Sequence, residues 1–143
     1  MDRPIASIEV AYLIHATEDE GKVESCLVEM LGVPFIPEKD ELQGHFGNPI
    51  VRARIHLTGD EANAVFGSII STLPSGVRRE VAVSLEAHLD EHMALYLRLD
   101  KQRLVGGSVA LGDDDAVRIK IKPRLHSMRG GAREYFLGRL GGG

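Results

Sequence analysis

The chain is short of the residue types that build several kinds of protein site. It has one cysteine, no tryptophan, three tyrosines and four phenylalanines among 143 residues. One thiol cannot form an internal disulfide, and without a cysteine or histidine cluster at ligand spacing it cannot build a zinc finger. The scarcity of aromatic rings limits the base stacking on which single-stranded nucleic-acid binders depend.

Long apolar runs are also missing. No segment approaches the ~20 apolar residues that cross a bilayer. The first residues, MDRPIASIEV, lack the basic stretch and apolar segment of a signal peptide. With 43% hydrophobic and 27% charged residues, the composition is that of a globular protein. We therefore expect one domain, residues 1–143, located in the cytoplasm and without a membrane partner.

The formal net charge of −4 hides a division along the chain. Residues 1–117 contain ten basic and twenty acidic residues, whereas residues 118–143 contain seven basic residues and one acidic residue, Glu134. Charge asymmetry of this kind indicates a polyanionic partner such as nucleic acid. We therefore expect the last strand and a basic C-terminal tail or helix, residues 124–143, to face that partner.

Hydrophobic periodicity predicts most of the secondary structure. Alternation indicates strands, and apolar residues at i, i+3, i+4 and i+7 indicate helices. Thr17 and Glu20 have the spacing of a capping box at the start of the first helix. The expected strands are 4–15, 50–57, 85–89, 95–99, 108–111 and 117–122, and the expected helices are 18–31, 59–73, 75–83 and 129–140.

Two connections complete the predicted fold. Residues 33–49 are rich in proline and glycine and are expected to form a loop. Residues 85–89 and 95–99 indicate a β-hairpin, in which matching apolar faces place Leu89 opposite Leu95. The element order predicts an α+β fold: a single domain with a twisted, mainly antiparallel sheet and helices packed on one face.

Residues that could carry catalysis or hold a metal are not arranged for it. His88 and His92 are four apart, which is a ligand spacing only on a helix, whereas the surrounding alternation predicts a strand and a turn. Cys26 lies on the apolar stripe of the first helix, and Asp113–Asp115 is typical of a solvated turn. No nucleophile-elbow, phosphate-loop or dinucleotide motif occurs. We therefore expect no catalytic residue, metal or cofactor.

Basic residues occupy the outward positions of the predicted strands and the connection after 95–99. They are Arg52, Arg54, His56, Arg98, Lys101, Arg103, Arg118, Lys120 and Lys122. If the strands are neighbours, these side chains form one patch beside the basic tail, suited to phosphates. The alternative is that outward positions of a half-exposed sheet are polar in any case and have no function.

Three separated motifs resemble a known protein family. They are T-E-D-E at 17–20, G-H-F-G-N-P-I at 44–50 and L-Y-L-R-L-D-K-Q at 95–102. In this order, followed by a basic strand, they resemble an archaeal family of predicted RNA-binding proteins, often called predicted exosome subunits. The resemblance spans almost the whole chain. It implies a double-stranded-RNA-binding-domain-like or ribosomal-protein-L5-like α+β fold, no catalysis and a role in RNA metabolism.

The family motifs also point to individual positions. By resemblance they fall on His45, Asn48, Arg98, Lys101 and Gln102. A structural alternative exists at each of them. In particular, the expected turn is formed by Gly44, Gly47, Asn48 and Pro49, with the glycines supplying positive φ.

The leading hypothesis is a non-enzymatic RNA-binding protein that contacts structured RNA through its outward basic residues and its tail. It would be an accessory factor of RNA processing or of the archaeal exosome. The alternative is a protein-interaction module or homodimer without direct RNA binding, in which the basic tail pairs with the acidic body of a second chain.

Overall fold

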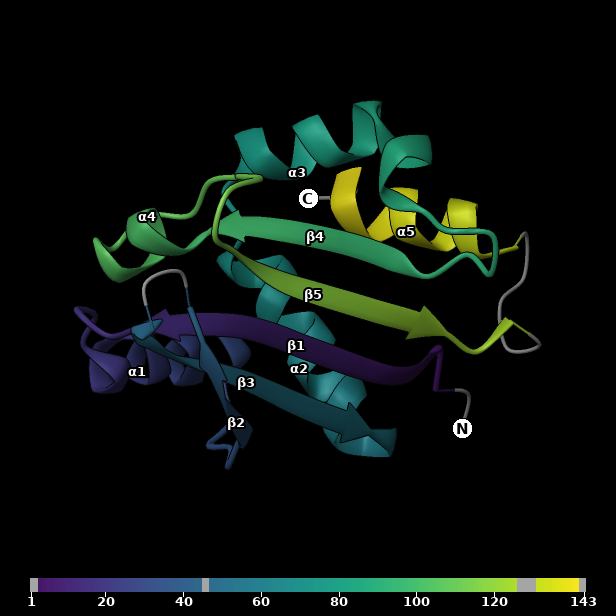
Figure 1. The fold of residues 1–143 in the computed structure, drawn as a ribbon. Coiled ribbons are helices and arrows are strands. Elements are labelled where there is room, and N and C mark those ends of the chain that lie inside the picture. The colour runs from purple at the N-terminus through teal and green to yellow at the C-terminus, as the bar shows by residue number, and fades with distance from the viewer. Residues whose placement is uncertain (1–2, 45–46, 126–130, 142–143) are drawn as a thin grey trace.

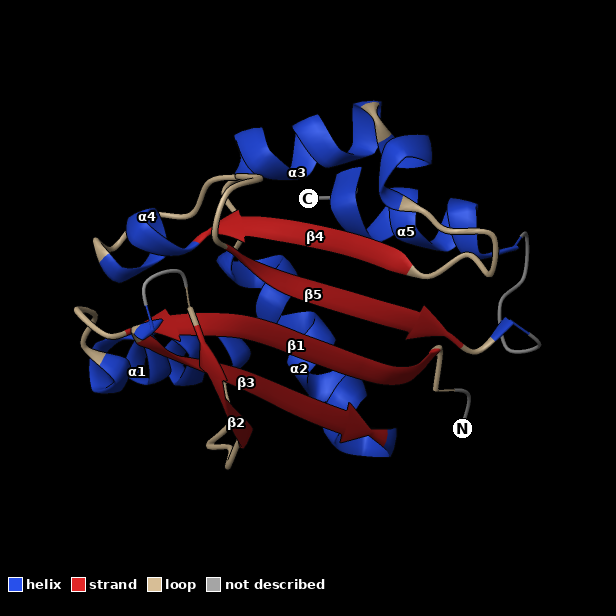
Figure 2. Ribbon diagram, viewed as in Figure 1, coloured by secondary structure: helices blue, strands red, loops and turns tan. Residues whose placement is uncertain are grey.

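The computed structural model describes residues 3–44, 47–125 and 131–141, and within them one antiparallel sheet in the order β2-β3-β1-β5-β4. Helices pack behind this sheet in the view of Figures 1 and 2, which confirms the predicted α+β class. The elements in chain order are β1 (Ile5–His15), α1 (Glu20–Leu31), β2 (Glu38–Gln43), β3 (Pro49–Thr58), α2 (Gly59–Thr72), α3 (Ser75–Val83), the 3₁₀ helix η2 (Leu85–His88), β4 (Leu95–Asp100), α4 (Lys101–Val105), β5 (Ala116–Pro123) and α5 (Gly131–Gly141).

The core lies between the inner face of the sheet and the helices. From Ile8 onward, alternate residues of β1 are buried, and β3, β4 and β5 repeat this pattern. The apolar stripe of α2 packs against them through Val65, Phe66 and Ile69, all of which are buried. Burial of each such side chain contributes about 1.5–3 kcal/mol, so this layer contact fixes which face of the sheet stays bare.

The C-terminal helix completes the core. Ala132, Phe136 and Leu140 of α5 are buried, and the Phe136 ring lies edge-on to Phe66 at a centroid distance of 6.1 Å. The predicted helix is confirmed over the described residues, although its predicted start at Arg129 lies outside them. Because α5 packs on the helical side, Arg139 lies over the Phe66 ring and away from the outward residues of the strands. That the tail contacts RNA stays a prediction.

The predicted capping box is replaced by a different helix start. Asp19 is the N-cap of α1, and its carboxylate accepts a hydrogen bond from the backbone N–H of Lys22. Glu18 instead turns back and accepts from the backbone N–H of His15. Within T-E-D-E, Asp19 therefore caps α1, and Glu18 holds the end of β1 through its hydrogen bond from His15.

The predicted hairpin at 85–99 is only partly present. The pairing of Leu89 with Leu95 is confirmed as an isolated bridge, but residues 85–88 form the 3₁₀ helix η2. Instead, β4 pairs along its whole length with β5, which places Leu97 opposite Ile119. Alternation shows which residues of a strand face the core, but it does not show which strand pairs with it. The alternating apolar residues of β5 match those of β4 over a longer stretch than residues 85–89 do. The predicted strand 108–111 likewise reduces to a bridge between Leu99 and Leu111.

Part of the predicted loop at 33–49 is a strand. Residues Glu38–Gln43 form β2, which pairs with β3 at the edge of the sheet. All six of its side chains are exposed, so no apolar face marked it in the sequence. The chain also lacks, in its described part, any helix long and apolar enough to cross a membrane.

Candidate nucleic-acid interface

The sheet face turned away from the helices carries the basic residues. In Figure 2 no helix covers this face, which we call the outer face. Strand alternation sends six basic side chains to it, and the register joins them across neighbouring strands. They are Arg52 and Arg54 of β3, Arg98 of β4, and Arg118, Lys120 and Lys122 of β5, with His56 also outward on β3.

One register row brings three arginines into line. Arg54 lies opposite Ala11 of β1, Ala11 lies opposite Arg118, and Arg118 lies opposite Arg98. The small side chain of Ala11 therefore separates Arg54 from the other two. Directly opposite residues have Cβ atoms about 4.5–5.5 Å apart. Arg118 and Arg98 thus present two guanidinium groups from adjacent strands with no residue between them.

The Arg98–Arg118 pair is not neutralised by the described chain. Both residues are exposed, and no ion pair within 4.0 Å reaches either of them among residues 3–44, 47–125 and 131–141. Like charges placed directly opposite each other destabilise a sheet. A bound anion would relieve this repulsion, so the arrangement suits a phosphate better than it suits the sheet alone.

The neighbouring row continues the positive surface with a cation beside an aromatic ring. Lys120 lies opposite Tyr96, and its Nζ is 5.6 Å from the centre of the tyrosine ring. The Tyr96 side chain raises the pKa of Lys120, burial opposes this, and the carboxylates of Glu9 and Asp90 raise the pKa further. Lys120 therefore stays charged. In this row Glu9 of β1 lies directly opposite Lys120 on one side and His56 on the other, so a carboxylate separates the two basic side chains.

The β3 half of the outer face is different because β2 supplies acids to it. Asp40 lies opposite Arg52, with 3.0 Å between its Oδ2 and Arg52 Nη2, and its Oδ2 is 3.6 Å from Arg54 Nη2. Glu38 lies opposite Arg54 in the same register. The free positive charge of the outer face is thus concentrated on β4 and β5.

Lys101 does not belong to this surface, which corrects the prediction that it contacts phosphate. Its side chain is completely buried, and Nζ donates to the carbonyl of Leu13, to Glu18 Oε1 at 2.8 Å and to Asp115, whose Oδ2 is 2.9 Å away. The three ammonium protons therefore have three partners. Lys101 ties the end of β1, the start of α1 and the turn before β5.

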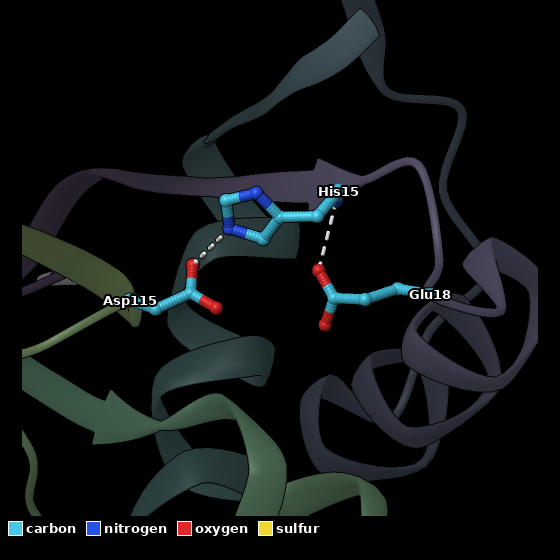
Figure 3. A group of neighbouring side chains, drawn as sticks. All are labelled: His15, Glu18 and Asp115. Atoms are coloured by element: carbon cyan, nitrogen blue, oxygen red, sulfur yellow. Dashed lines mark hydrogen bonds and ion pairs between the residues drawn. The ribbon is translucent and has the colours of Figure 1, made fainter. Parts of the chain in front are cut away.

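His15 and the two carboxylates around Lys101 resemble a metal-binding group in outline. His15, Glu18 and Asp115 each offer a ligand atom within 4.8 Å of the others (Figure 3). His15 Nε2 is 3.2 Å from Asp115 Oδ1. However, the Lys101 ammonium already lies between the carboxylates and supplies the cation that they require. The group is better described as a buried salt bridge than as a metal centre.

The other predicted residues lie at the margins of the interface. Gln102 and Arg103 are exposed on α4, beyond the end of β4, and Gln102 Nε2 donates to Glu18 Oε2 at 2.9 Å. The turn residues lie between β2 and β3. Gly47 has the predicted positive φ, +77°, whereas the prediction is wrong for Gly44, which does not adopt positive φ; its N–H donates to the Asn48 carbonyl at 2.7 Å. Pro49 begins β3. His45 lies outside the described residues.

An open groove of about 580 Å³ borders the outer face at β4. Tyr96 and Arg98 line it from β4, His88 from η2 and Asp113 from the loop before β5. The groove therefore shares Arg98 with the positive surface just described.

Residues 7–123 match the model of a protein family described as RNA binding. The chain belongs to this RNA-binding family. It is 34% identical over 119 residues to an uncharacterized protein of Methanocaldococcus jannaschii, covering 78% of this chain and 80% of that protein. It is 30% identical over 131 residues to an RNA-binding protein of Pyrococcus abyssi, covering 86% of this chain and 84% of the relative.

Solved structures support the same family. A DUF54 protein from Methanothermobacter thermautotrophicus is 28% identical to this chain and has a TM-score of 0.73, with 97% of each chain covered. The family resemblance carried by the three sequence motifs is thereby confirmed, and these relatives are archaeal.

Sequence reasoning missed the acidic residues that divide the outer face of this family member. Glu38 and Asp40 lie on a strand without an apolar pattern, so the sequence did not reveal that they lie opposite Arg54 and Arg52. The alternation of charge in E-K-D-E, followed by the turn at 44–48, was the available signal. The groove was missed because its walls come from segments far apart in the chain.

Proposed function

We propose that this chain is a non-enzymatic RNA-binding protein whose outer face, chiefly on β4 and β5, contacts the phosphates of structured RNA. The observation that carries the proposal is that Arg98 and Arg118 lie directly opposite each other and that neither forms an ion pair with the described residues. Lys120 and Lys122 extend the pair along β5 on the same side. Membership of a family described as RNA binding and the name of the Pyrococcus abyssi relative support RNA as the polyanion.

The residue types on the outer face favour structured RNA. Tyr96 is the one aromatic residue that the described strands send to this face, so a run of stacked bases has no platform there. Phosphate and shape contacts, which double-stranded RNA offers, require few aromatic rings. An open sheet face with spaced cations is suited to that kind of contact.

The cellular role is part of the same proposal. An accessory place in RNA processing, such as the archaeal exosome, and a cytoplasmic location follow from the family resemblance and the composition. The test for the first is co-purification of the full chain with exosome core subunits, before and after ribonuclease treatment. Absence of those subunits under both conditions would remove the exosome role and leave RNA binding untouched.

The binding test compares two charge-matched variants. Affinity for a structured RNA hairpin is measured by fluorescence anisotropy at several salt concentrations. Arg98→Gln/Arg118→Gln should bind more weakly, and the slope of log affinity against log salt should fall by about 2, one for each lost phosphate contact. The control, Arg79→Gln/Arg139→Gln, removes two exposed charges on the helical side and should change neither quantity appreciably. Equal behaviour of both variants would refute the proposed interface.

A second candidate is a protein-interaction module or homodimer. It is favoured by Ile36, which is 96% exposed beside β2, a strand whose outer edge pairs with no strand in the described chain. Light scattering during size-exclusion chromatography tests it. A monomer at every concentration, combined with salt-dependent RNA binding, would reject this candidate, whereas a dimer dispersed by Ile36→Asp would support it.

A further inference from the structure

The groove beside β4 is assembled from four separate segments. Glu80 comes from α3, His88 from η2, Tyr96 and Arg98 from β4, and Asp113 from the loop that leads to β5. Its volume of about 580 Å³ falls within the range of small-molecule sites, which is about 300–1,000 Å³. It is large enough for one planar ring system of a ligand that continues outside it.

The groove opens next to a site for an anion. Arg98 lines the groove and also faces Arg118 across the sheet. A ligand with one end in the groove could therefore place a negative group between the two guanidinium groups. A nucleotide has this combination, because a neutral planar base is joined through its sugar to a charged phosphate.

The polar groups in the groove are mainly hydrogen-bond acceptors. Glu80 and Asp113 are exposed carboxylates that form no ion pair within the described parts of the chain. His88 Nδ1 donates to the backbone carbonyl of Tyr96 at 3.0 Å, so Nε2 is the ring nitrogen left for a ligand. In the neutral imidazole this Nε2 is also an acceptor. The groove thus suits a base whose edge carries N–H donors.

Amino-bearing bases satisfy such acceptors best. Cytosine presents an N4 amino group, adenine an N6 amino group and guanine an N2 amino group. Uracil carries no amino group, and its one donor on that edge, N3–H, lies between two carbonyl oxygens that the carboxylates would repel. The apolar part of the lining, which includes Leu89 and Leu111, suits the faces of any of these rings.

The walls of the groove are held in place by local contacts. The Tyr96 hydroxyl donates to Asp90 Oδ2 at 3.2 Å, while Asp90 Oδ1 accepts from the backbone N–H of Ala94 at 2.9 Å. On the other side, Gly112 lies in close contact with the end of β4: a Cβ added at Gly112 would lie 2.9 Å from the Cβ of Asp100 and 3.1 Å from the Cα of Asp100. The site is therefore largely formed before a ligand arrives.

We propose that this groove binds one unstacked, amino-bearing nucleobase of the RNA whose adjacent phosphate lies between Arg98 and Arg118. The inference rests on the proposed function and adds a ligand class to it. The outer face then has two parts with separate tasks: β5 and β4 hold the backbone, and the groove reads whether an unpaired A, C or G is present next to the contacted helix.

The experiment uses one RNA hairpin in five forms: blunt-ended, or extended by a single 3′ A, C, G or U. Wild-type protein should bind the A, C and G forms about fivefold or more tighter than the blunt form, a gain typical of one bound base, and the U form no tighter than the blunt form. Equal binding of the blunt and extended forms overturns the proposal while leaving the proposed function intact. A U form as tight as the others also overturns it.

A pair of variants separates base binding from general charge. Glu80→Ala/Asp113→Ala removes the two carboxylates of the groove and should abolish the advantage of the A, C and G forms without weakening the blunt hairpin. The control Glu91→Ala/Asp114→Ala removes two exposed acids outside the groove and should retain the advantage. If both double variants keep the advantage, the base binds elsewhere and the proposal fails. If no form binds at low salt, the proposed function fails as well.

Discussion

Arg98 on β4 lies directly opposite Arg118 on β5, and within the described chain no carboxylate neutralises either side chain. The two like charges destabilise the sheet at a position where an acidic residue on either strand would form a stabilising salt bridge. This relationship distinguishes a binding surface from ordinary solvated charge, and it makes stability and binding respond in opposite directions.

The single substitution Arg98→Gln should therefore stabilise the fold while weakening RNA binding. Relief of the cross-strand repulsion is expected to raise the free energy of unfolding by about 0.2–1 kcal/mol. Urea denaturation followed by circular dichroism measures this change, and anisotropy measures the loss of affinity. A variant that is both less stable and unchanged in binding would contradict the assignment.

Asp40→Asn should strengthen RNA binding. Its carboxylate is paired with Arg52 and lies near Arg54, so its removal frees two cations on the outer face. Exposed pairs of this kind are worth about 0.2–1 kcal/mol, which corresponds to a gain of about 1.4- to fivefold in affinity at low salt. The neighbouring acid Glu41, which lies opposite Val51, provides the control: Glu41→Gln removes the same charge from the same strand without freeing an arginine.

Lys101→Met should destabilise the protein strongly. The substitution leaves the carboxylates of Glu18 and Asp115 without their shared ammonium partner, and because the Asp115 side chain is 32% exposed and can be hydrated, the expected cost is about 1.5–3 kcal/mol. Gln102→Ala, at the next position, removes only an exposed hydrogen bond to Glu18 and should cost less than about 1 kcal/mol. Similar midpoints of urea unfolding for the two variants would show that Lys101 is not structurally important.

The same cluster should make stability depend on acidity. Burial alone would raise the pKa of Glu18, but hydrogen bonds from Lys101 and the His15 backbone, and the charge of Lys101, hold this pKa below its ordinary value of 4.5. A carboxyl group whose pKa is lowered by folding stabilises the protein above its unfolded pKa, and this contribution is lost as the pH falls through the folded pKa.

In the Glu18→Gln variant, the free energy of unfolding should therefore fall less steeply as the pH drops below about 5. Denaturant titrations at a series of pH values measure the slope for both proteins. An unchanged slope in the variant would mean that other carboxylates account for the acid sensitivity.

The sequence predicted which side of the sheet each side chain faces better than it predicted which strands pair with each other. Alternation in β3 and β5 correctly sent Arg52, Arg54 and Lys120 to one side, because the period of a strand is set by its own backbone. Pairing depends on contacts between distant segments, so neither the β4–β5 pairing nor the strand β2 could be read from local pattern. Strand alternation alone was enough to predict the proposed interface. Its division into a half with free cations and a half neutralised by β2 could be seen only once the strand pairing was known.

Lys101 shows a further limit of sequence reasoning. A lysine directly after an alternating strand is ordinarily solvent-exposed, and its motif suggested phosphate contact. Its burial depends on Glu18 and Asp115 reaching the same point from positions 83 and 14 residues away in sequence. Charged residues enter a core only with such partners, and the partners are visible only in three dimensions.

The contact between Phe66 and Phe136 bears on how the protein is made. The two rings are 70 positions apart, and the second belongs to the last described helix. Until that helix emerges from the ribosome, α2 exposes the Phe66 ring and β4 lacks part of its covering layer. The nascent chain therefore cannot close its core before residues 131–141 have emerged. The outer face, whose strands are complete by residue 123, is fully backed only after α5 has been synthesised.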